Sequence, residues 1–366
     1  MMGTESFGVI NDIAQVFRPY IQNIYQDLKL GLCKTKVDIE RISGAAERAE
    51  SQFRLVLPYC SKKLKWEVIF DASTPWFAPD FRFDDETFLN NLDEDFLEDK
   101  VPSLAKWNEN DPKALSGVIS ELLNLYKIHQ IRKLNEDESS RAYFEYSALL
   151  GDALTSETDI EVWVGSHVVE FLIRLNVDTS RLPELFNESV DQNPGIDTAL
   201  LLVRYPNSTN AELILSPLLT KSLGNIALPP MHQSGVLMDY VPMVTELLNN
   251  KIQALLNNEK LKRELLAQLI VRYEGAVLEH DANNAAFLFE MNDFHWMLQI
   301  DIGAKFPDKP PILTLRSVYH SSKGKPKFKV LPSCPYNNFE GYIEQQVEIF
   351  KNECKGLCSQ IVNVEN

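Results

Sequence analysis

The chain has 366 residues, 45% of them hydrophobic, which suits two or three globular domains and excludes a disordered protein. Its 36 basic and 52 acidic side chains give a net charge of 36 − 52 = −16, which repels nucleic acid and anionic membrane surfaces. No apolar run reaches the roughly 18 residues of a membrane span, and "MMGTESFGVI" lacks the features of a secretory signal. The five cysteines, an odd and sparse set, indicate reduced thiols in the cytoplasm or nucleus.

The first 150 residues predict strands placed between two helices. Helical and alternating apolar spacings give, in order, a helix over 7–28, strands over 33–42, 52–59, 64–71 and 80–83, and a helix over 111–134. Pro19 predicts a kink in the first helix. Asp111 is expected to cap the second helix, with Pro112 in its first turn.

The remaining residues predict two further groups of elements. In the middle, strands are expected over 161–177, 198–206 and 211–219, then a loop over 225–242 and a helix over 243–256. The last third predicts a helix over 257–275 closed by Gly275, strands over 276–281, 285–291, 294–302 and 311–320, and a helix over 339–355.

Two proline-rich segments indicate an internal repeat. They are 74–79, which contains Pro75 and Pro79, and 305–311, which contains Pro307, Pro310 and Pro311. We call them the first and second elbow. Proline fixes its own φ and donates no hydrogen bond, so each elbow should end one strand and re-aim the next.

The repeat can be aligned residue by residue. "WEVIFD" at 66–71 matches "WMLQID" at 296–301 at an offset of 296 − 66 = 230. The elbow prolines match at an offset of 307 − 75 = 232. The difference of two residues is expected between strand and elbow, where a loop tolerates it.

A helix, a four-strand meander, a proline elbow and following helices resemble the fold of ubiquitin-conjugating enzymes. The resemblance implies an α+β protein of tandem UEV/RWD domains, each an antiparallel four-strand meander packed on helices. The expected domains are 1–150 and 257–366. Residues 151–256 between them are either a degenerate third copy or an unrelated α+β insert.

Active members of that fold carry His-Pro-Asn before a cysteine that accepts ubiquitin as a thioester, and the amide polarises the attacked carbonyl. Neither unit contains His-Pro-Asn, and Cys334 in "LPSCPYNN" has the wrong spacing and neighbours. The resemblance is therefore to inactive ubiquitin-conjugating-enzyme variants. The six histidines contain no His-x-His pair of a JAMM zinc site, so we expect no metal or cofactor in this chain.

Longer stretches are similar to the BRE family, the brain-and-reproductive-organ-expressed proteins: "LKWEVIFDA", "SSRAYFEYSALL", "DTALLLVRYP", "LMDYVPMVTELLNNKIQ" and "LTLRSVYH". This resemblance implies a scaffold subunit of the BRISC and ARISC assemblies, cytoplasmic and nuclear, with a role in the DNA-damage response. Its implied partners are a JAMM zinc deubiquitinase, an Abraxas-type subunit and a von Willebrand A-like subunit. The implied substrate is lysine-sixty-three-linked polyubiquitin, which is also a candidate ligand of this chain.

Candidate partner-binding residues lie in two places. Trp76 and Phe77 form the tip of the first elbow, either as an exposed anchor for a partner or folded back onto their own domain. The resemblance assigns the von Willebrand A-like subunit to 257–366. There, "HSSKGKPKFKV" carries the lysines, with two tyrosines nearby, as a steering patch or as a solvated loop: Lys323, Lys325, Lys327, Lys329, Tyr319 and Tyr336.

The segment 84–99 departs from the pattern of the family, whose members are shorter at this place. Residues 84–99 hold eight acids and no base, and serve either as a solvated loop or as a contact for a basic partner. Two other functions stay open from the sequence: ubiquitin conjugation through Cys334, and an adaptor outside ubiquitin biology that shares only the fold.

Overall fold

A computed structural model describes residues 13–42, 51–90, 94–151, 155–180, 182, 195, 198–206, 211–231, 235–322, 325–332 and 339–362. The chain divides into two compact units, 1–252 and 253–366, each described here by itself. Both combine antiparallel sheets with helices, which confirms the predicted α+β class. The division at 150 and 256 and the UEV/RWD assignment stay predictions.

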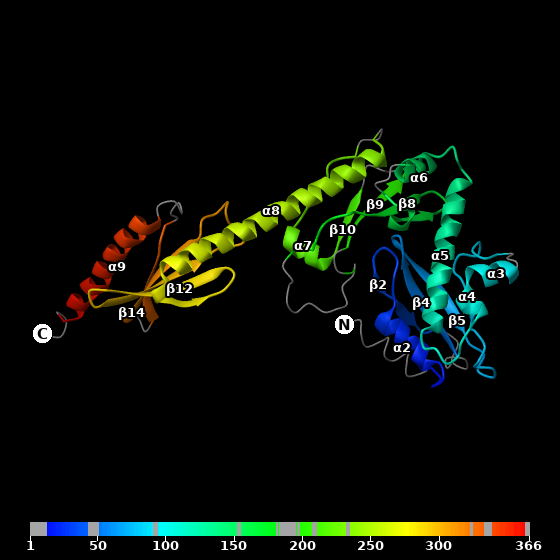
Figure 1. The fold of residues 1–366 in the computed structure, drawn as a ribbon, viewed down its shortest axis with the longest axis horizontal. Coiled ribbons are helices and arrows are strands. Elements are labelled where there is room, and N and C mark those ends of the chain that lie inside the picture. The colour runs from blue at the N-terminus through cyan, green and yellow to red at the C-terminus, as the bar shows by residue number, and fades with distance from the viewer. Residues whose placement is uncertain are drawn as a thin grey trace. The chain divides into compact units, whose positions relative to one another are not determined.

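The first unit contains two four-stranded antiparallel meanders (Figure 1). The first has the order β3-β4-β5-β6, with bounds Asp38–Glu40, Gln52–Tyr59, Lys62–Ile69 and Asp80–Arg82. The middle one has the order β7-β8-β9-β10, with bounds Ile160–Val164, Val169–Arg174, Ala199–Tyr205 and Glu212–Leu215. A short pair, β1 (Lys29–Leu30) and β2 (Thr35–Lys36), precedes the first meander.

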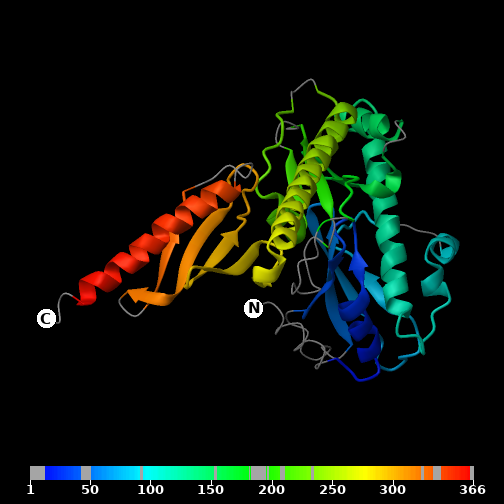
Figure 2. The ribbon, with the colours of Figure 1, turned by 60° about the vertical axis from the view of Figure 1, so that its left-hand side comes forward.

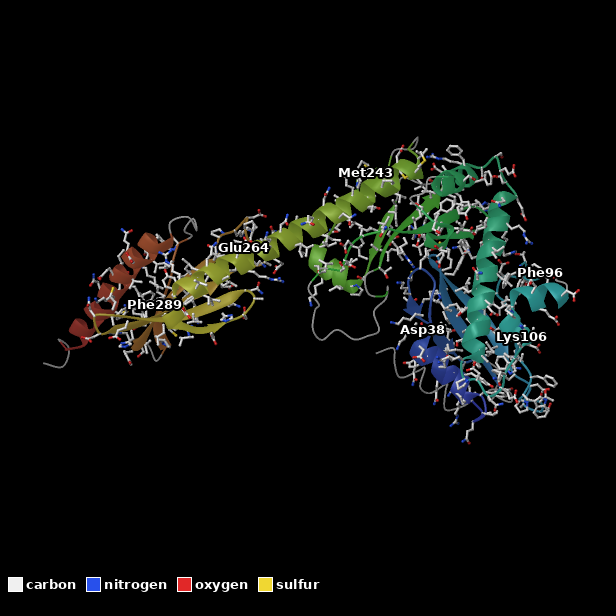
Figure 3. The ribbon with its side chains drawn as sticks, viewed as in Figure 1. Asp38, Phe96, Lys106, Met243, Glu264 and Phe289 are labelled. Atoms are coloured by element: carbon white, nitrogen blue, oxygen red, sulfur yellow. The ribbon has the colours of Figure 1, made fainter. Side chains whose placement is uncertain are left out.

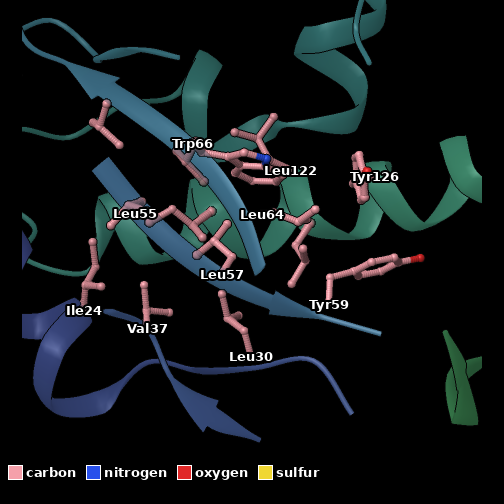
Figure 4. Packing of buried hydrophobic residues seen from close by; sticks show 14 of the residues in the cluster. Ile24, Leu30, Val37, Leu55, Leu57, Tyr59, Leu64, Trp66, Leu122 and Tyr126 are labelled. Carbon is pink, nitrogen blue, oxygen red and sulfur yellow. The ribbon is translucent and has the colours of Figure 1, made fainter. Parts of the chain in front are cut away.

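The helices of this unit follow the chain as α2 (Arg18–Asp27), α3 (Glu94–Lys100), α4 (Pro102–Ala105), α5 (Ala114–Asn135), α6 (Arg141–Gly151), α7 (Pro217–Leu223) and the beginning of α8 (Leu237–Arg272). A 3-10 turn, Glu157–Asp159, precedes β7. The predicted face of α5, with Leu115, Ile119, Leu122 and Tyr126, is buried in the core. Figure 4 shows this face against Trp66 and the side chains of the first meander.

The two meanders share a hydrophobic cluster on one face of the middle sheet. Leu172 of β8 and Leu200 and Leu202 of β9 belong to the same buried cluster as the first meander and α5. The two meanders therefore pack together within the first unit, and the alternating residues of each strand supply the contact.

Several predicted boundaries were wrong, each for a local reason. Helix α2 begins at Arg18, and residues 13–17 before it form turns where helix was predicted; the predicted part over 7–12 lies outside the described ranges. Pro19 lies in the first turn of α2, where a missing N–H costs nothing. Asp111 does not cap α5. Its carboxylate accepts the Lys113 N–H at 2.9 Å, in the turn before the helix. The strand predicted over 211–219 ends at Leu215, because Ser216 caps α7 by accepting the Leu219 N–H.

Helix α8 replaces two predicted helices and part of a loop. It runs for 36 residues, with Pro242 inside it, where 225–242 was expected to be a loop. No glycine or proline separates residues 243–272, so nothing breaks the helix at the expected boundary near 256. Gly275 lies in a following 3-10 turn, Glu274–Ala276, and not at the helix end.

The second unit is a five-stranded antiparallel sheet of order β11-β12-β13-β14-β15, covered by helices on one face. The bounds are Val277–His280, Asn284–Met291, Phe294–Asp301, Ile312–Ser322 and Lys325–Val330. Five side chains of the helices pack on its buried face: Leu266 and Leu269 of α8, and Ile343, Val347 and Phe350 of α9 (Phe339–Val362). Figure 2 shows the red helix α9 lying along this sheet. On β12, Phe289, labelled in Figure 3, stacks on Trp296 with ring centroids 4.6 Å apart.

Strand β15 was not predicted. Its sequence, "KPKFKV", alternates lysine with other residues, a pattern that also fits a basic loop. The strand pairs with β14 from Thr314↔Val330 to Ser322↔Lys325, with a register shift between Arg316 and Ser321.

The two units share one register at a single offset of 232. Strands β12 and β13 have the bounds of β4 and β5 shifted by 284 − 52 = 232 and 294 − 62 = 232. The pairs that close the elbow connections, Ile69↔Asp80 and Asp301↔Ile312, also differ by 301 − 69 = 232 and 312 − 80 = 232. The expected two-residue shift between strand and elbow is therefore wrong. Trp66 and Trp296 differ by 230, so they lie one side-chain repeat apart along equivalent strands, and both still face the core.

Candidate partner-binding surfaces

The first elbow lies in a ten-residue connection, 70–79, between the antiparallel neighbours β5 and β6. Asp71 organises it: its carboxylate accepts the Ser73 N–H at 2.9 Å and the hydroxyls of Ser73 and Thr74 at 2.7 and 2.8 Å. These bonds lower the pKa of Asp71. Pro79 is buried at the end of the connection and Pro75 is half-buried. The elbow is thus a defined turn anchored on the sheet.

The second elbow shares the start of this turn and then differs from it: the Phe306–Pro307 bond is cis, which Thr74–Pro75 is not, and the Lys309 N–H donates to the Lys305 carbonyl. The bond from Phe306 N–H to the Gly303 carbonyl corresponds to the one from Thr74 N–H to the Asp71 carbonyl, since 306 − 74 and 303 − 71 both equal 232. Pro311 is buried, Pro307 half-buried and Pro310 exposed. Asp308 and Lys309 are exposed where the first elbow has its aromatic pair.

Trp76 and Phe77 project from the first elbow into solvent. Their side chains are 54% and 63% exposed, and their ring centroids lie 6.2 Å apart in a tilted arrangement. The Phe77 N–H donates to the Thr74 carbonyl at 3.1 Å, which fixes the turn that presents both rings. The interpretation that they fold back onto their own domain is therefore wrong, and a docking role stays a prediction.

Two of the predicted lysines, on one side of β15, contact helix α9. Lys327 Nζ donates to the Glu353 carbonyl of α9 at 2.5 Å, and Lys329 Nζ pairs with the Glu353 carboxylate at 2.8 Å. These two lysines thus hold the strand to its own helix. Lys325 lies at the start of β15, and Lys323 and Tyr336 lie outside the described residues.

Tyr319 is largely exposed, at 71%. Its ring packs edge-on against His295 of β13, with centroids 5.3 Å apart. The residues that alternate with the lysines, Phe328 and Val330, are also exposed, at 61% and 54%. Sequence reasoning passed over this apolar set, although the alternation along "KPKFKV" could have revealed it.

The acidic segment 84–99 is partly structural. Asp85 accepts from Lys133 Nζ of α5 at 3.1 Å, and Asp84 accepts the Lys65 N–H of β5 at 2.9 Å. Phe88 is buried, and the segment continues into α3. The first acids therefore attach the segment to α5 and the sheet, and they are not a plain solvated loop.

Sequence reasoning missed a buried carboxylate where the first meander meets the middle one. Glu161 of β7 accepts the Leu32 N–H at 2.8 Å through Oε1 and the Cys60 N–H at 2.6 Å through Oε2. Burial raises the pKa of Glu161, against the lowering effect of these bonds. A buried acid that satisfies two backbone donors fixes both segments relative to β7.

A second carboxylate lies beside it. Glu170 of β8 accepts from the Ser61 hydroxyl and from Lys62 Nζ at 2.9 Å, and Arg204 Nε lies 3.4 Å away. Burial raises the pKa of Glu170, but the bonds from Ser61 and Lys62 outweigh it and the pKa is lowered. Together the two acids tie the β4–β5 turn of the first meander to the middle sheet.

Two thiols of the first unit, Cys33 and Cys60, are poor nucleophiles. Burial raises the pKa of Cys33 to about 11, with a further contribution from the charge of Glu161, and burial also raises the pKa of Cys60. A catalytic cysteine needs a lowered pKa, because the thiolate is the reactive form. Cys334 lies outside the described residues.

The described ranges contain neither a metal-binding group of side chains nor a membrane-spanning helix. No group of three or more His, Cys, Asp or Glu side chains there is placed to hold a metal ion. No helix in those ranges has the length and apolar character needed to cross a membrane.

Comparison with known proteins identifies the family. Residues 11–321 match the family model described as brain and reproductive organ-expressed protein (BRE). The chain is 32% identical to "BRISC and BRCA1-A complex member 2" of Branchiostoma floridae, over 90% of both chains. It is 31% identical to the protein of the same name from Danio rerio, over 90% of this chain and 89% of that one. The chain therefore belongs to the brain and reproductive organ-expressed protein family.

Proposed function

We propose that this chain is a non-catalytic scaffold subunit of a JAMM-type deubiquitinase complex that acts on lysine-sixty-three-linked polyubiquitin. The observation that carries the proposal is the similarity, over 90% of the chain, to two proteins named as members of the BRISC and BRCA1-A complexes. Because the match covers nearly the full length of both chains, the similarity extends to all of their domains and is not limited to one shared domain.

Three structural observations support a scaffold. The pKa values of Cys33 and Cys60 are raised, which disfavours covalent catalysis through these two thiols. The two meanders of the first unit share a hydrophobic cluster and two buried acids, which makes a rigid support. The elbows occupy equivalent positions and carry opposite side-chain chemistry, aromatic in the first and charged in the second, so they would select different partners.

The proposed architecture is a tandem of inactive ubiquitin-conjugating-enzyme variants. The middle meander, with its four antiparallel strands between α6 and α7, supports a third degenerate copy over an unrelated insert. The chain would link the Abraxas-type subunit and deubiquitinase to the von Willebrand A-like subunit, with 257–366 holding the latter. Its work would lie in the nucleus, in the DNA-damage response, and in cytoplasmic signalling, with polyubiquitin as a further ligand.

The test is reconstitution of the full chain with the three partner subunits, followed by gel filtration. Co-elution with the Abraxas-type and von Willebrand A-like subunits is expected, and the complex should cleave lysine-sixty-three-linked chains while this chain alone cleaves none. A chain that elutes alone in the presence of all three subunits contradicts the proposal.

The aromatic pair gives a sharper form of the test. Replacing Trp76 and Phe77 together by alanine should weaken capture of one partner by about tenfold or more, as for a hot spot. Phe144→Ala is the matched control, because Phe144 is 60% exposed on α6 and lies outside the elbow. If both variants lose the same amount of partner capture, the aromatic pair of the first elbow is not a partner-binding site.

The competing enzymatic function has its own assay. Incubation with ubiquitin, ATP and activating enzyme should give no reducible adduct. A thioester band that disappears in Cys334→Ala would establish conjugation and contradict the non-catalytic assignment.

A further inference from the structure

The five-stranded sheet of the second unit has an outer face that no described helix covers. Directly paired residues in an antiparallel sheet share a face, so the registers define its rows. One row crosses four strands as Leu288↔Met297, Met297↔Arg316 and Arg316↔Phe328. The next crosses them as Ala286↔Gln299, Gln299↔Thr314 and Thr314↔Val330.

The first row is mostly apolar, and the second joins the exposed Val330 to the polar Thr314 and Gln299 and the buried Ala286. Leu288, Phe328 and Val330 are among the exposed large hydrophobic residues, and Met297 is half-buried. Ile312, in the row after them, is 52% exposed. The side chains of α8 and α9 in the unit's core contact the opposite face, through residues such as Trp296 and Leu315. A contiguous apolar sheet face of this kind marks a contact surface.

A single cation lies within these rows. Arg316 is half-buried between Met297 and Phe328, and no described carboxylate pairs with it. Glu290, on the same face, lies 3.4 Å from His295 instead. Lys327 and Lys329 face away, toward Glu353. A partner that covers these rows must therefore bring a carboxylate to Arg316, since an unpaired buried guanidinium is costly.

The other end of the face is hollow and acidic. A hollow of about 550 Å³ is lined by Ala286, Gln299, Thr314 and Ile312 of the outer face, with Glu279, Asp281 and Asp301 at its rim. The face thus changes from a cation to carboxylates along its length. An acidic residue of the partner would be attracted to Arg316 at one end of the face and repelled by the carboxylates at the other end, so the partner can bind in one orientation only.

We infer that the outer face of β12–β15 binds an amphipathic helix of a partner protein, whose aliphatic side chains cover Leu288, Met297, Phe328 and Val330 and whose carboxylate pairs with Arg316. Four strands at about 4.8 Å spacing span roughly 14 Å, slightly more than the about 10–12 Å diameter of a helix. Such a helix would place aliphatic residues at three- and four-residue spacing. The inference rests on the proposed function for its source of partner, and it specifies the chemistry of the contact.

The experiment uses the full chain co-expressed with the three proposed partner subunits. A photo-crosslinking phenylalanine replaces Phe328, and the crosslinked peptide is identified by mass spectrometry. We expect a partner peptide with aliphatic residues at helical spacing and an acidic residue between them. A crosslink to a second copy of this chain or to ubiquitin, or none while the partners co-elute, overturns the inference.

Charge and shape are separated by substitution in the full chain. Phe328→Glu and Arg316→Glu should each weaken capture of the crosslinked partner at least tenfold, and Arg316→Lys should retain most of it. Val271→Glu is the control: Val271 is 77% exposed on α8, which packs on the opposite face, so capture should change less than twofold. Unchanged melting temperatures show that the variants fold, and unchanged capture by Phe328→Glu contradicts the inference.

The failures can be distinguished. If the unmodified chain captures no subunit, the proposed function fails and the inference fails with it. If the unmodified chain captures its partners and only the outer-face variants behave like Val271→Glu, the inference alone fails.

Discussion

Removal of the Glu161 carboxylate tests the connection between the two meanders of the first unit. Glu161→Ala leaves the N–H groups of Leu32 and Cys60 without the acceptor that they now have at 2.8 and 2.6 Å. Each unsatisfied buried donor costs about 1–3 kcal/mol, and relief of the buried acid offsets part of the sum, so we expect a loss of about 2–4 kcal/mol. Glu161→Gln keeps one acceptor and should lose about half as much.

Amide hydrogen exchange measures this effect where it arises. The peptides that contain Leu32 and Cys60 should exchange faster in Glu161→Ala, together with a lower urea midpoint of the first unit. Glu212→Ala is the control, because Glu212 is an exposed acid of β10 paired with Arg204 at 3.3 Å; it should cost less than about 1 kcal/mol. Unchanged exchange at Leu32 and Cys60 would refute the reasoning.

The pH dependence of the same variant follows from the raised pKa of Glu161. Burial is the largest cause, opposed by the bonds from Cys60 and Leu32 and by the charges of Lys127 and Arg174. A raised folded-state pKa means that the contribution of Glu161 is fully present below the ordinary value of 4.5 and is lost as pH rises through the folded-state pKa. The stability difference between the native chain and Glu161→Ala should therefore shrink from pH 4 to pH 7, and a difference that grows would show that the hydrogen bonds outweigh burial.

Three further predictions concern the elbows and the thiols. Pro79→Ala and Pro311→Ala should each lower the free energy of unfolding by about 1 kcal/mol, because both prolines are buried at the start of a strand; equal denaturation curves for variant and native chains would argue against the shared elbow. Trp76→Ala with Phe77→Ala should change stability by less than about 0.5 kcal/mol, since both rings are mostly exposed, and a larger loss in urea denaturation would indicate a structural role. Cys33 should react slowly with a thiol reagent at pH 8, because burial raises its pKa to about 11; rapid modification of the folded chain would contradict that environment.

The strands were predictable because their signal is local. Alternation placed β4, β5, β12 and β13 within two residues of their observed bounds. Strand β15 was not predicted, because its inner side carries lysines instead of apolar residues. The charge of Lys329 there is neutralised by Glu353 of α9, which lies far away in the sequence. A helix boundary near 256 was expected from the repeat, but local helix propensity continued α8 through it.

Among the candidate sites, too, local features were predictable from the sequence and long-range contacts were not. The aromatic pair of the first elbow was predictable, since two prolines hold two rings in a short turn. Glu161 was not, because its donors lie 129 and 101 residues earlier in the chain and no period in the sequence relates them. The predicted alignment of the repeat was wrong by two residues along the strand, because it paired the identical Trp66 and Trp296. The hairpin turns at 60–61 and 292–293 give the observed offset, but their sequences are less alike.

The constant offset of 232 has a consequence for how this protein diversifies. Between equivalent closing pairs, each unit carries a ten-residue cassette, 70–79 or 302–311, on an unchanged strand frame. Length is the property that strand register constrains, whereas the side chains at the tip are free to change. Changes confined to the cassette, in its side chains and in the turn that holds them, can therefore exchange an aromatic tip for a charged one. The same geometry makes the two cassettes transplantable, so that recognition can be moved from one unit to the other without rebuilding either sheet.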